Sequence, residues 1–148
     1  MKRCFIDSNI VVYANDTNAG EKQSMAIAAI IRCMKAGVGY ISIQVLQEYA
    51  NVALKKLGQA PPIVLRQLKI LEALKVIIPS PNSVRRSVEI SHTYHISFWD
   101  AGIIAAAEDA DCEVILSEDL STGQYYAGIE MCNPLVRTFD ISRYTNRF

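Results

Sequence analysis

Four acidic residues occupy places where an α/β fold gathers its functional groups. They are Asp7, Glu48, Asp100 and Asp119. The first and the last follow short apolar runs that are typical of buried strands, and the middle two lie near the starts of predicted helices. Ligands of open α/β sheets bind beyond the carboxyl ends of the strands, so we expect the four carboxylates to converge on one cleft.

A convergent cluster of this kind predicts a divalent metal site. Carboxylates without a basic partner repel one another, which raises some of their pKa values unless a cation neutralises them. Ligands that are all oxygen suit Mg²⁺ or Mn²⁺ and leave coordination positions for water or phosphate. The expected chemistry is metal-assisted hydrolysis of a phosphodiester, with Glu48 or Asp119 orienting or deprotonating the attacking water.

Asp7 and Glu48 also have purely structural interpretations. Asp7 can cap the turn after the first strand, yet Asp7-Ser8-Asn9 places three oxygen-bearing side chains at the strand end, which favours a functional role. Glu48 can be a solvated helix residue. It lies at the edge of the apolar face of its helix, however, with no Lys or Arg three or four positions further on.

Asp100 and the pair Glu118-Asp119 have stronger structural alternatives. A Ser three residues before Asp100 makes a pattern similar to a capping box. The helix that Asp100 opens is apolar on every side and must be buried, which favours function. Glu118 and Asp119 can be a loop pair before a turn, and either can be the fourth acid. Ser117 is a candidate to orient a metal ligand or water.

Alternating strand and helix patterns position these residues. Short apolar runs predict strands at residues 4–6, 38–43, 76–78, 114–116 and near Ile129. Helical spacing predicts helices at residues 21–35, 45–57, 61–74, 84–94 and 97–110, with only an apolar turn at 10–14. This alternation implies right-handed crossovers and a parallel central sheet. We expect one domain over residues 1–136 and a basic, aromatic tail over 137–148 that is extended or mobile.

The composition excludes several classes of protein. The chain has 148 residues, 51% of them hydrophobic and 20% charged, which is neither disordered nor coiled-coil composition. No apolar run approaches the length of a membrane span, and Asp7 interrupts the only run that resembles a signal peptide. The four scattered cysteines indicate small buried side chains in a reducing cytoplasm, and two histidines three apart make a zinc site improbable.

Five segments match, in order, the sequence motifs of a known family. They are Phe5-Ile6-Asp7-Ser8-Asn9-Ile10-Val11-Val12-Tyr13-Ala14, Gln47-Glu48, Ser97-Phe98-Trp99-Asp100-Ala101 with Ile103-Ile104-Ala105-Ala106-Ala107, Ser117-Glu118-Asp119-Leu120, and Gly128-Ile129 to Asn133-Pro134. The chain thereby resembles the PIN-domain ribonucleases, and within them the VapC-type toxins of prokaryotic toxin–antitoxin pairs. The resemblance spans residues 5–134. Any one motif is weak, whereas four acids in order at these spacings are specific.

The resemblance implies a PIN-like three-layer α/β/α sandwich and Mg²⁺- or Mn²⁺-dependent endonucleolytic cleavage of RNA, with tRNA or rRNA as possible targets. It carries the four acids over as catalytic residues, with Asp7, Asp100 and Asp119 as metal ligands and Asn9 as a nearby polar group. It also implies a small antitoxin that binds a hydrophobic groove. Self-association is a further implication, and its candidate contact residues, which equally suit the core, are Leu65, Leu68 and Leu71.

Three other functions are weaker interpretations of the same residues. A phosphohydrolase of the haloacid-dehalogenase kind needs a second Asp two residues after the first, and that position is Asn9. A dinucleotide- or nucleotide-binding fold has no support because neither GxGxxG nor GxxxxGK[ST] occurs. A PIN-fold binding module without catalysis remains open, although the presence of all four acids argues against it.

The zero net charge conceals an uneven distribution. Residues 100–119 hold seven acids and no Lys or Arg, so the rest of the chain carries fifteen bases and eight acids. A bound metal ion would neutralise part of the negative charge of residues 100–119. Candidate bases for the phosphates of an RNA are Lys55, Lys56, Arg85 and Arg86.

Overall fold

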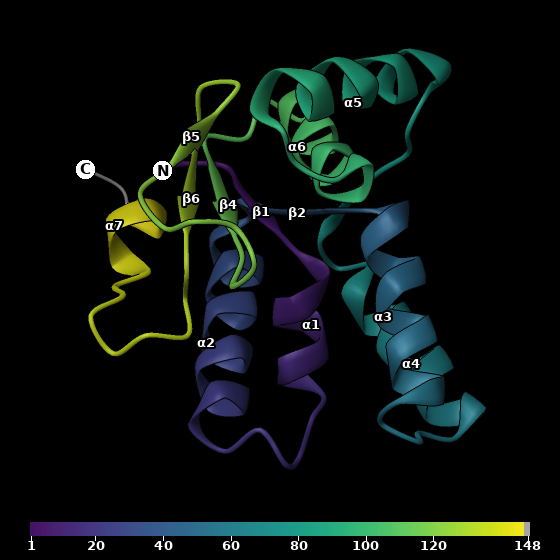
Figure 1. Ribbon diagram of the computed structural model, residues 1–148. Coiled ribbons are helices and arrows are strands. Elements are labelled where there is room, and N and C mark those ends of the chain that lie inside the picture. Colours follow the sequence, from purple (N-terminus) through teal and green to yellow (C-terminus); the bar gives the residue numbers. More distant parts are fainter. Residues whose placement is uncertain (147–148) are drawn as a thin grey trace.

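A six-stranded sheet forms the centre of the computed structural model, which describes residues 1–146 (Figure 1). The strand order is β3-β2-β1-β4-β6-β5. All neighbouring strands pair in parallel except β5, which is antiparallel to β6. The strands are β1 (Cys4–Ile6), β2 (Gly39–Ser42), β3 (Lys75–Ile77), β4 (Val114–Leu116), β5 (Tyr125–Tyr126) and β6 (Ile129–Cys132). The expected α/β class with a mainly parallel central sheet is confirmed.

Helices cover both faces of this sheet. They are α1 (Ser8–Ala14), α2 (Glu21–Ala36), α3 (Ile43–Lys55), α4 (Pro61–Leu71), α5 (Pro81–Tyr94), α6 (Phe98–Asp109) and α7 (Ser142–Thr145). Figure 1 shows α1 and α2 on one side of the sheet and α5 and α6 on the other, which is the three-layer arrangement expected. None of the helices within residues 1–146 has the length and apolar character needed to cross a bilayer.

Side-chain caps start four of the helices, α1, α3, α5 and α6, and the caps of α1 and α3 also mark where β1 and β2 end. Asp7 caps α1 by accepting a hydrogen bond from the next backbone N–H, so the apolar turn expected at residues 10–14 is in fact a helix. Ser42 caps α3 by accepting from the backbone N–H of Val45, which ends β2 one residue before the predicted boundary. Ser97 caps α6 by accepting from the backbone N–H of Asp100.

The core lies between the sheet and the two helix layers. Strands β1 and β4 are buried throughout, and six residues of α6 are buried, as its uniformly apolar sequence predicts. All four cysteines are buried and free, as expected of small apolar side chains. Leu71 is also a core residue, so its candidate role in self-association is wrong, whereas Leu65 is 65% exposed.

The C-terminal segment differs from the extended tail that its composition suggested. Residues 142–145 form α7, and Tyr144 is only 5% exposed. The backbone carbonyl of Tyr144 accepts a hydrogen bond from Lys2, and its hydroxyl lies 3.0 Å from the Cys132 sulfur. The apolar ring of Tyr144 is buried with its hydroxyl partnered, and this anchors the segment. Residues 147 and 148 of the predicted tail lie outside the described residues.

Candidate active site

Asp7 lies at the buried centre of the candidate site, between β1 and α1. The residue is 4% exposed. Its Oδ1 accepts the backbone N–H of Ser8 at 2.7 Å, and its Oδ2 accepts the hydroxyl of Ser117 at 2.8 Å. Because β1 and β4 are adjacent parallel strands, the residue after each strand reaches the same edge of the sheet. Strand pairing therefore brings two residues together that are 110 positions apart.

The electrostatic environment of Asp7 disfavours its charged form. Burial raises the pKa of the Asp7 carboxyl to about 6, and the negative charges of Glu48 and Asp119 add to the rise. Hydrogen bonds from Ser117 and from the backbone of Ser8 act in the opposite direction and lower the pKa. Three acids from distant parts of the sequence thus share one electrostatic environment, as convergence on one cleft requires.

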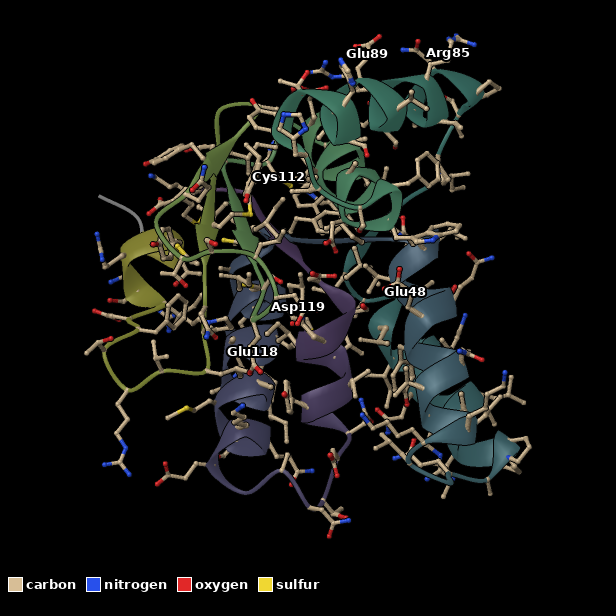
Figure 2. The ribbon with its side chains drawn as sticks, in the orientation of Figure 1. Glu48, Arg85, Glu89, Cys112, Glu118 and Asp119 are labelled. Carbon is tan, nitrogen blue, oxygen red and sulfur yellow. The ribbon has the colours of Figure 1, made fainter. Side chains whose placement is uncertain are left out.

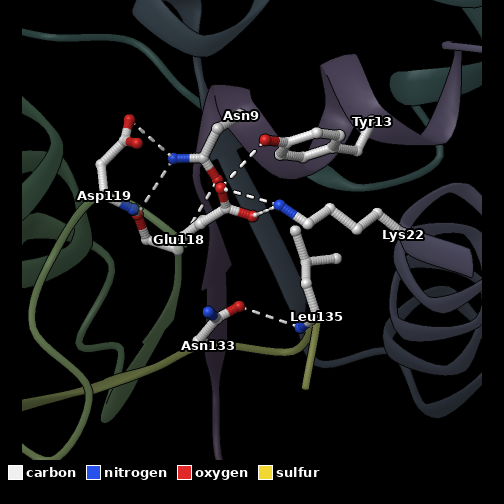
Figure 3. Close-up of polar contacts among 8 residues, drawn as sticks. Asn9, Tyr13, Lys22, Glu118, Asp119, Asn133 and Leu135 are labelled. Atoms are coloured by element: carbon white, nitrogen blue, oxygen red, sulfur yellow. Dashed lines mark hydrogen bonds and ion pairs between the residues drawn. The ribbon is translucent and has the colours of Figure 1, made fainter. Parts of the chain in front are cut away.

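The side chain of Asn9 connects α1 with the loop after β4 (Figure 3). Its Nδ2 donates to Asp119 Oδ2 at 3.0 Å and to the Ser117 hydroxyl at 3.1 Å. Its Oδ1 accepts the backbone N–H of Glu118 at 3.2 Å. The Ser117 hydroxyl also accepts the backbone N–H of Asp119 at 3.1 Å. Asn9 and Ser117 therefore hold the Asp119 loop against Asp7, which is the supporting position expected of both residues.

Glu118 and Asp119 are adjacent in sequence but point to different partners (Figure 3). The Glu118 carboxylate accepts the hydroxyl of Tyr13 at 2.9 Å and forms an ion pair with Lys22 at 3.1 Å. The Lys22 ammonium also lies 5.0 Å from the centre of the Tyr13 ring. The Asp119 carboxylate is exposed and lies beside Asn9. Of the two acids, only Glu118 is neutralised by a cation of the described chain.

Glu48 approaches the site from α3, on the other side of α1 from Asp119 (Figure 2). One carboxylate oxygen accepts the hydroxyl of Ser8, and the other accepts Nε2 of Gln44 at 2.6 Å. The same Nε2 donates to the backbone carbonyl of Trp99 at 2.9 Å. Gln44 therefore links the helix that carries Glu48 to the start of α6.

Gly102 makes room for Gln44. A Cβ atom at position 102 would lie 2.6 Å from Gln44 Oε1, closer than real Cβ atoms approach. Glycine at this position of α6 thus leaves the space that the Gln44 amide occupies. The sequence alone does not indicate that Ser8 contacts Glu48, or that Gln44 and Gly102 belong to the site. The one available signal was that Gln44 precedes Glu48 by four positions, the spacing at which helix side chains meet.

Asp100 stands apart from the other three acids. It occupies the first turn of α6, where its backbone N–H is capped by Ser97 at 3.0 Å, and it is half-buried. Within residues 1–146 its carboxylate makes no hydrogen bond and no ion pair. The structure therefore groups Asp7, Glu48 and Asp119, and places Asp100 at the neighbouring helix start with its carboxylate available.

A pocket of about 380 Å³ opens beside the acids. Ser8, Asn9, Glu48 and Asp119 form part of its wall. The rest of the wall comes from α1, the following turn and α3, and comprises Val12, Tyr13, Asp16, Asn51, Val52, Lys56 and Leu57. Lys56 supplies a positive charge to this wall, in agreement with its candidate role as a phosphate-binding base.

The bases outside the acidic segment pair with acids inside it. Arg86 binds Glu108 through two hydrogen bonds of 2.7 and 3.0 Å and also binds Glu89, so it is not the free phosphate contact that was expected. Arg85 lies on the outer face of α5 (Figure 2). No Lys or Arg in the described part of the chain forms an ion pair with the four candidate acids.

The donor set of the site fits a hard divalent cation. Every candidate ligand is a carboxylate, and Asp7 is a buried acid without a cationic partner among residues 1–146. In that same range, however, no three His, Cys, Asp or Glu side chains are gathered closely enough to hold a metal as they stand. Amide groups of Asn9 and Gln44 provide the positive ends of dipoles that face Asp119 and Glu48 in this arrangement.

Comparison with known proteins shows the family of the chain. The PIN domain model matches residues 4–126. The chain therefore belongs to the PIN domain family, as the order and spacing of its acids predicted. No curated protein matches the sequence.

Solved structures with a similar fold include three from VapC and VapBC systems. VapC20 of Mycobacterium tuberculosis, a toxin that cleaves the sarcin–ricin loop, is 16% identical with a TM-score of 0.61, over 86% of this chain and 98% of that one. DNA-bound VapBC from Salmonella typhimurium is 16% identical with a TM-score of 0.66, over 90% and 99%. VapBC2 from Rickettsia felis, bound to promoter DNA, is 17% identical with a TM-score of 0.64, over 88% and 97%.

Proposed function

We propose that this protein is a metal-dependent endoribonuclease that hydrolyses RNA phosphodiester bonds, and that it is the toxin of a toxin–antitoxin pair. The observation that carries the proposal is the buried Asp7, flanked electrostatically by Glu48 and Asp119 at the edge of a PIN-domain sheet. A buried carboxylate beside other negative charges is costly unless a cation or the reaction uses it, so such a group is typical of functional sites.

Asp7, Asp100 and Asp119 are the residues that we assign to hold Mg²⁺ or Mn²⁺. Bound there, the ion supplies a coordinated water of lowered pKa and stabilises charge on the phosphate. Asn9 and Ser117 orient Asp119 and Asp7. We assign Asp119, rather than Glu118, as the fourth acid because Lys22 and Tyr13 hold the Glu118 carboxylate.

Glu48 is assigned to orient the attacking water. It lines the pocket, and both of its oxygens accept hydrogen bonds. A carboxylate held at a pocket wall by two hydrogen bonds is suited to accept a hydrogen bond from water and to aim the water at a phosphate.

Cleavage of RNA by purified variants tests the assignment. Asp7→Asn, Asp100→Asn and Asp119→Asn are each expected to lose about 100-fold or more of Mn²⁺-dependent cleavage, because each removes a ligand charge. EDTA should abolish the wild-type activity and excess Mn²⁺ should restore it. Asp111→Asn is the matched control, since Asp111 lies in the same acidic segment with its side chain 88% exposed. Undiminished cleavage by Asp7→Asn, with circular dichroism like that of the wild type, contradicts the proposal.

The alternative is a PIN-fold binding module without catalysis. It predicts RNA binding that is unchanged by EDTA and an absence of metal-stimulated cleavage. The same assay therefore separates the two functions, and tRNA and rRNA are the substrates to use first.

The proposed antitoxin partner and a self-associated state need separate tests. A groove of about 440 Å³ between α3, α4 and β3 suits a short apolar segment, and its lining comprises Ile43, Leu46, Gln47, Ala50, Leu68, Glu72, Val76 and Ile78. Where a small open reading frame adjoins the gene, co-expression of its product should relieve the toxicity of this chain. Leu65→Glu should weaken a homodimer in size-exclusion chromatography if the exposed face of α4 is its interface.

A further inference from the structure

Trp99 is the only tryptophan of the chain and is exposed beside the candidate acids. Its exposure is 67%, an unusual amount for so large an apolar side chain. It directly precedes Asp100 in the first turn of α6. The Phe98 ring packs edge-on against it, with the ring centres 5.2 Å apart at an angle of 75°. The contact restrains the indole but leaves much of its surface open.

The backbone at Trp99 is tied to the active site. Gln44 Nε2 donates to the carbonyl of Trp99 and, at the same time, to Glu48. A hollow of about 420 Å³ next to the indole is lined by Trp99, Gln44, Gln47 and Glu48. Since Glu48 also lines the pocket of the acids, the two hollows meet at this carboxylate.

Three of the four side chains that line this hollow are polar. Gln44 is already engaged, whereas Gln47 is exposed and its amide makes no hydrogen bond within residues 1–146. A free amide offers both a donor and an acceptor. An aromatic face with a free amide at its edge matches a nucleobase, which stacks through its ring and forms hydrogen bonds through its edge.

The charges of the site explain why RNA binding would need a subsite that recognises a base. The acids of the site repel RNA phosphates, and Lys56 is the one base within residues 1–146 that lines the catalytic pocket. Charge at the site itself is therefore a poor source of affinity for RNA. Stacking on an aromatic side chain contributes affinity that does not depend on phosphate charge.

We propose that Trp99 and Gln47 form a nucleobase subsite for the nucleotide next to the scissile phosphate, with Trp99 as the stacking platform and Gln47 as the group that reads the edge of the base. The proposal rests on the proposed ribonuclease function. Trp99 and Gln47 determine affinity and cleavage-site preference in this arrangement, and the acids carry out hydrolysis.

A protein segment is the rival occupant of this surface. Phe98 and Trp99 also border a groove toward α5 of about 180 Å³, where Val84 is exposed. A nucleobase is favoured because the larger hollow reaches Glu48 of the candidate site and combines the Trp99 indole with the amide of Gln47 in its lining.

Fluorescence of the single tryptophan tests binding directly. Short single-stranded oligoadenylate, oligouridylate and oligocytidylate are titrated into the wild-type protein in EDTA, and into Asp7→Asn with Mn²⁺. Stacking predicts a saturable change in tryptophan emission in at least one arm. The same RNAs, fluorescently labelled, should bind Trp99→Ala about tenfold or more weakly, while Trp99→Phe retains part of the affinity. Tyr125→Ala is the control, since Tyr125 is 58% exposed on β5. An unchanged emission in both arms overturns the proposal.

Cleavage kinetics give a second readout. Trp99→Ala should lower kcat/KM about tenfold, mainly through KM, and Gln47→Ala should change which bases flank the cleaved bonds. A loss in kcat alone indicates that Trp99 only positions α6, and this result overturns the subsite. Unchanged RNA binding by Trp99→Ala, together with weakened self-association or antitoxin capture, also overturns it. If the wild-type protein cleaves no RNA with Mn²⁺, the ribonuclease proposal fails, and the fluorescence titration still decides whether Trp99 binds a base.

Discussion

The Asp7 carboxylate has two roles, because it caps a helix and also lies buried close to other acids. Its hydrogen bonds from Ser8 and Ser117 stabilise the charge, while burial opposes it more strongly. The net effect is a pKa near 6 in the folded protein, against 3.8 for the free side chain. Asp7 thus stores unfavourable electrostatic energy that a bound cation can release.

The raised pKa of Asp7 predicts how stability depends on pH in metal-free buffer. Between pH 4 and pH 6 the folded state binds the Asp7 proton more tightly than the unfolded state does, so stability falls as pH rises through this window and then levels off. Asp7→Asn cannot ionise, and at pH 7 it should exceed the wild type by up to about 3 kcal/mol, with the difference vanishing below pH 4. Urea unfolding in EDTA measures this, and a constant difference across the range contradicts it.

Gln44 is expected to position Glu48 rather than to touch substrate. Its amide binds Glu48 and the Trp99 carbonyl together, so Gln44→Ala should lower kcat about 10- to 100-fold with little change in KM. Gly102→Ala should act in the same direction by displacing Gln44. Gln67→Ala on α4 is the control and should leave both parameters unchanged. A Gln44→Ala variant with wild-type kcat refutes the positioning role.

At the scale of elements, strand ends and helix starts assemble the site. β1 and β4 are neighbours, so Asp7 and the Ser117–Asp119 segment meet at one edge of the sheet. α3 carries Glu48 to that edge, and Gln44 joins α3 to α6. Glu118 ties the loop after β4 to α1 and α2 through Tyr13 and Lys22. Asp7, Glu48 and Asp119 are therefore each held in part by an element other than their own.

The loop after β4 distinguishes the two adjacent acids. Glu118→Ala frees the loop from α1 and α2, so cleavage should fall about tenfold without being lost. Asp119→Ala removes a proposed ligand and should abolish cleavage. Rates measured at saturating Mn²⁺ compare the two, and Lys22→Ala should reproduce the milder effect. Full loss in Glu118→Ala with activity retained in Asp119→Ala reverses the assignment.

At the scale of the whole molecule, charge pairing leaves the site acidic within an electrically neutral chain. Arg86, Arg3 and Lys22 neutralise acids of the 100–119 segment at the surface. Asp100 and Asp119 of the same segment have no cation partner among residues 1–146. Among residues 1–146, Asp109 and Glu113 also form no ion pair, so pairing with cations reduces the negative charge of the segment without confining it to the site.

The C-terminal helix closes the molecule and contributes to its stability. Tyr144 is buried and contacts Cys132 and, through its backbone, Lys2. Tyr144→Ala should lower the free energy of unfolding by about 2–4 kcal/mol through the cavity that it leaves. Tyr125→Ala, at an exposed aromatic position, should lower it by well under half as much. Equal effects of the two substitutions in urea unfolding contradict an anchoring role for α7.

The sequence by itself determined the fold class and the order of most elements, and it predicted the four acids. Short apolar runs such as Cys4–Ile6 and the uniformly apolar α6 have local patterns that only a buried strand or helix satisfies. The acids could be proposed as site residues because they follow these predicted strands or lie near the starts of predicted helices. Local pattern missed α1, whose seven residues depend on the Asp7 cap, and the anchoring of α7, which depends on contacts with distant residues.

Tertiary structure decided which side chains face one another. Only the pairing of β1 with β4 brings Ser117 to Asp7 and Asn9, and only the packing of α3 against α6 brings Gln44 to the Trp99 carbonyl. The direction of Glu118 likewise depends on Lys22, which is 96 residues away. Such contacts join segments that no local pattern relates, because side-chain direction is fixed by packing after the chain has folded.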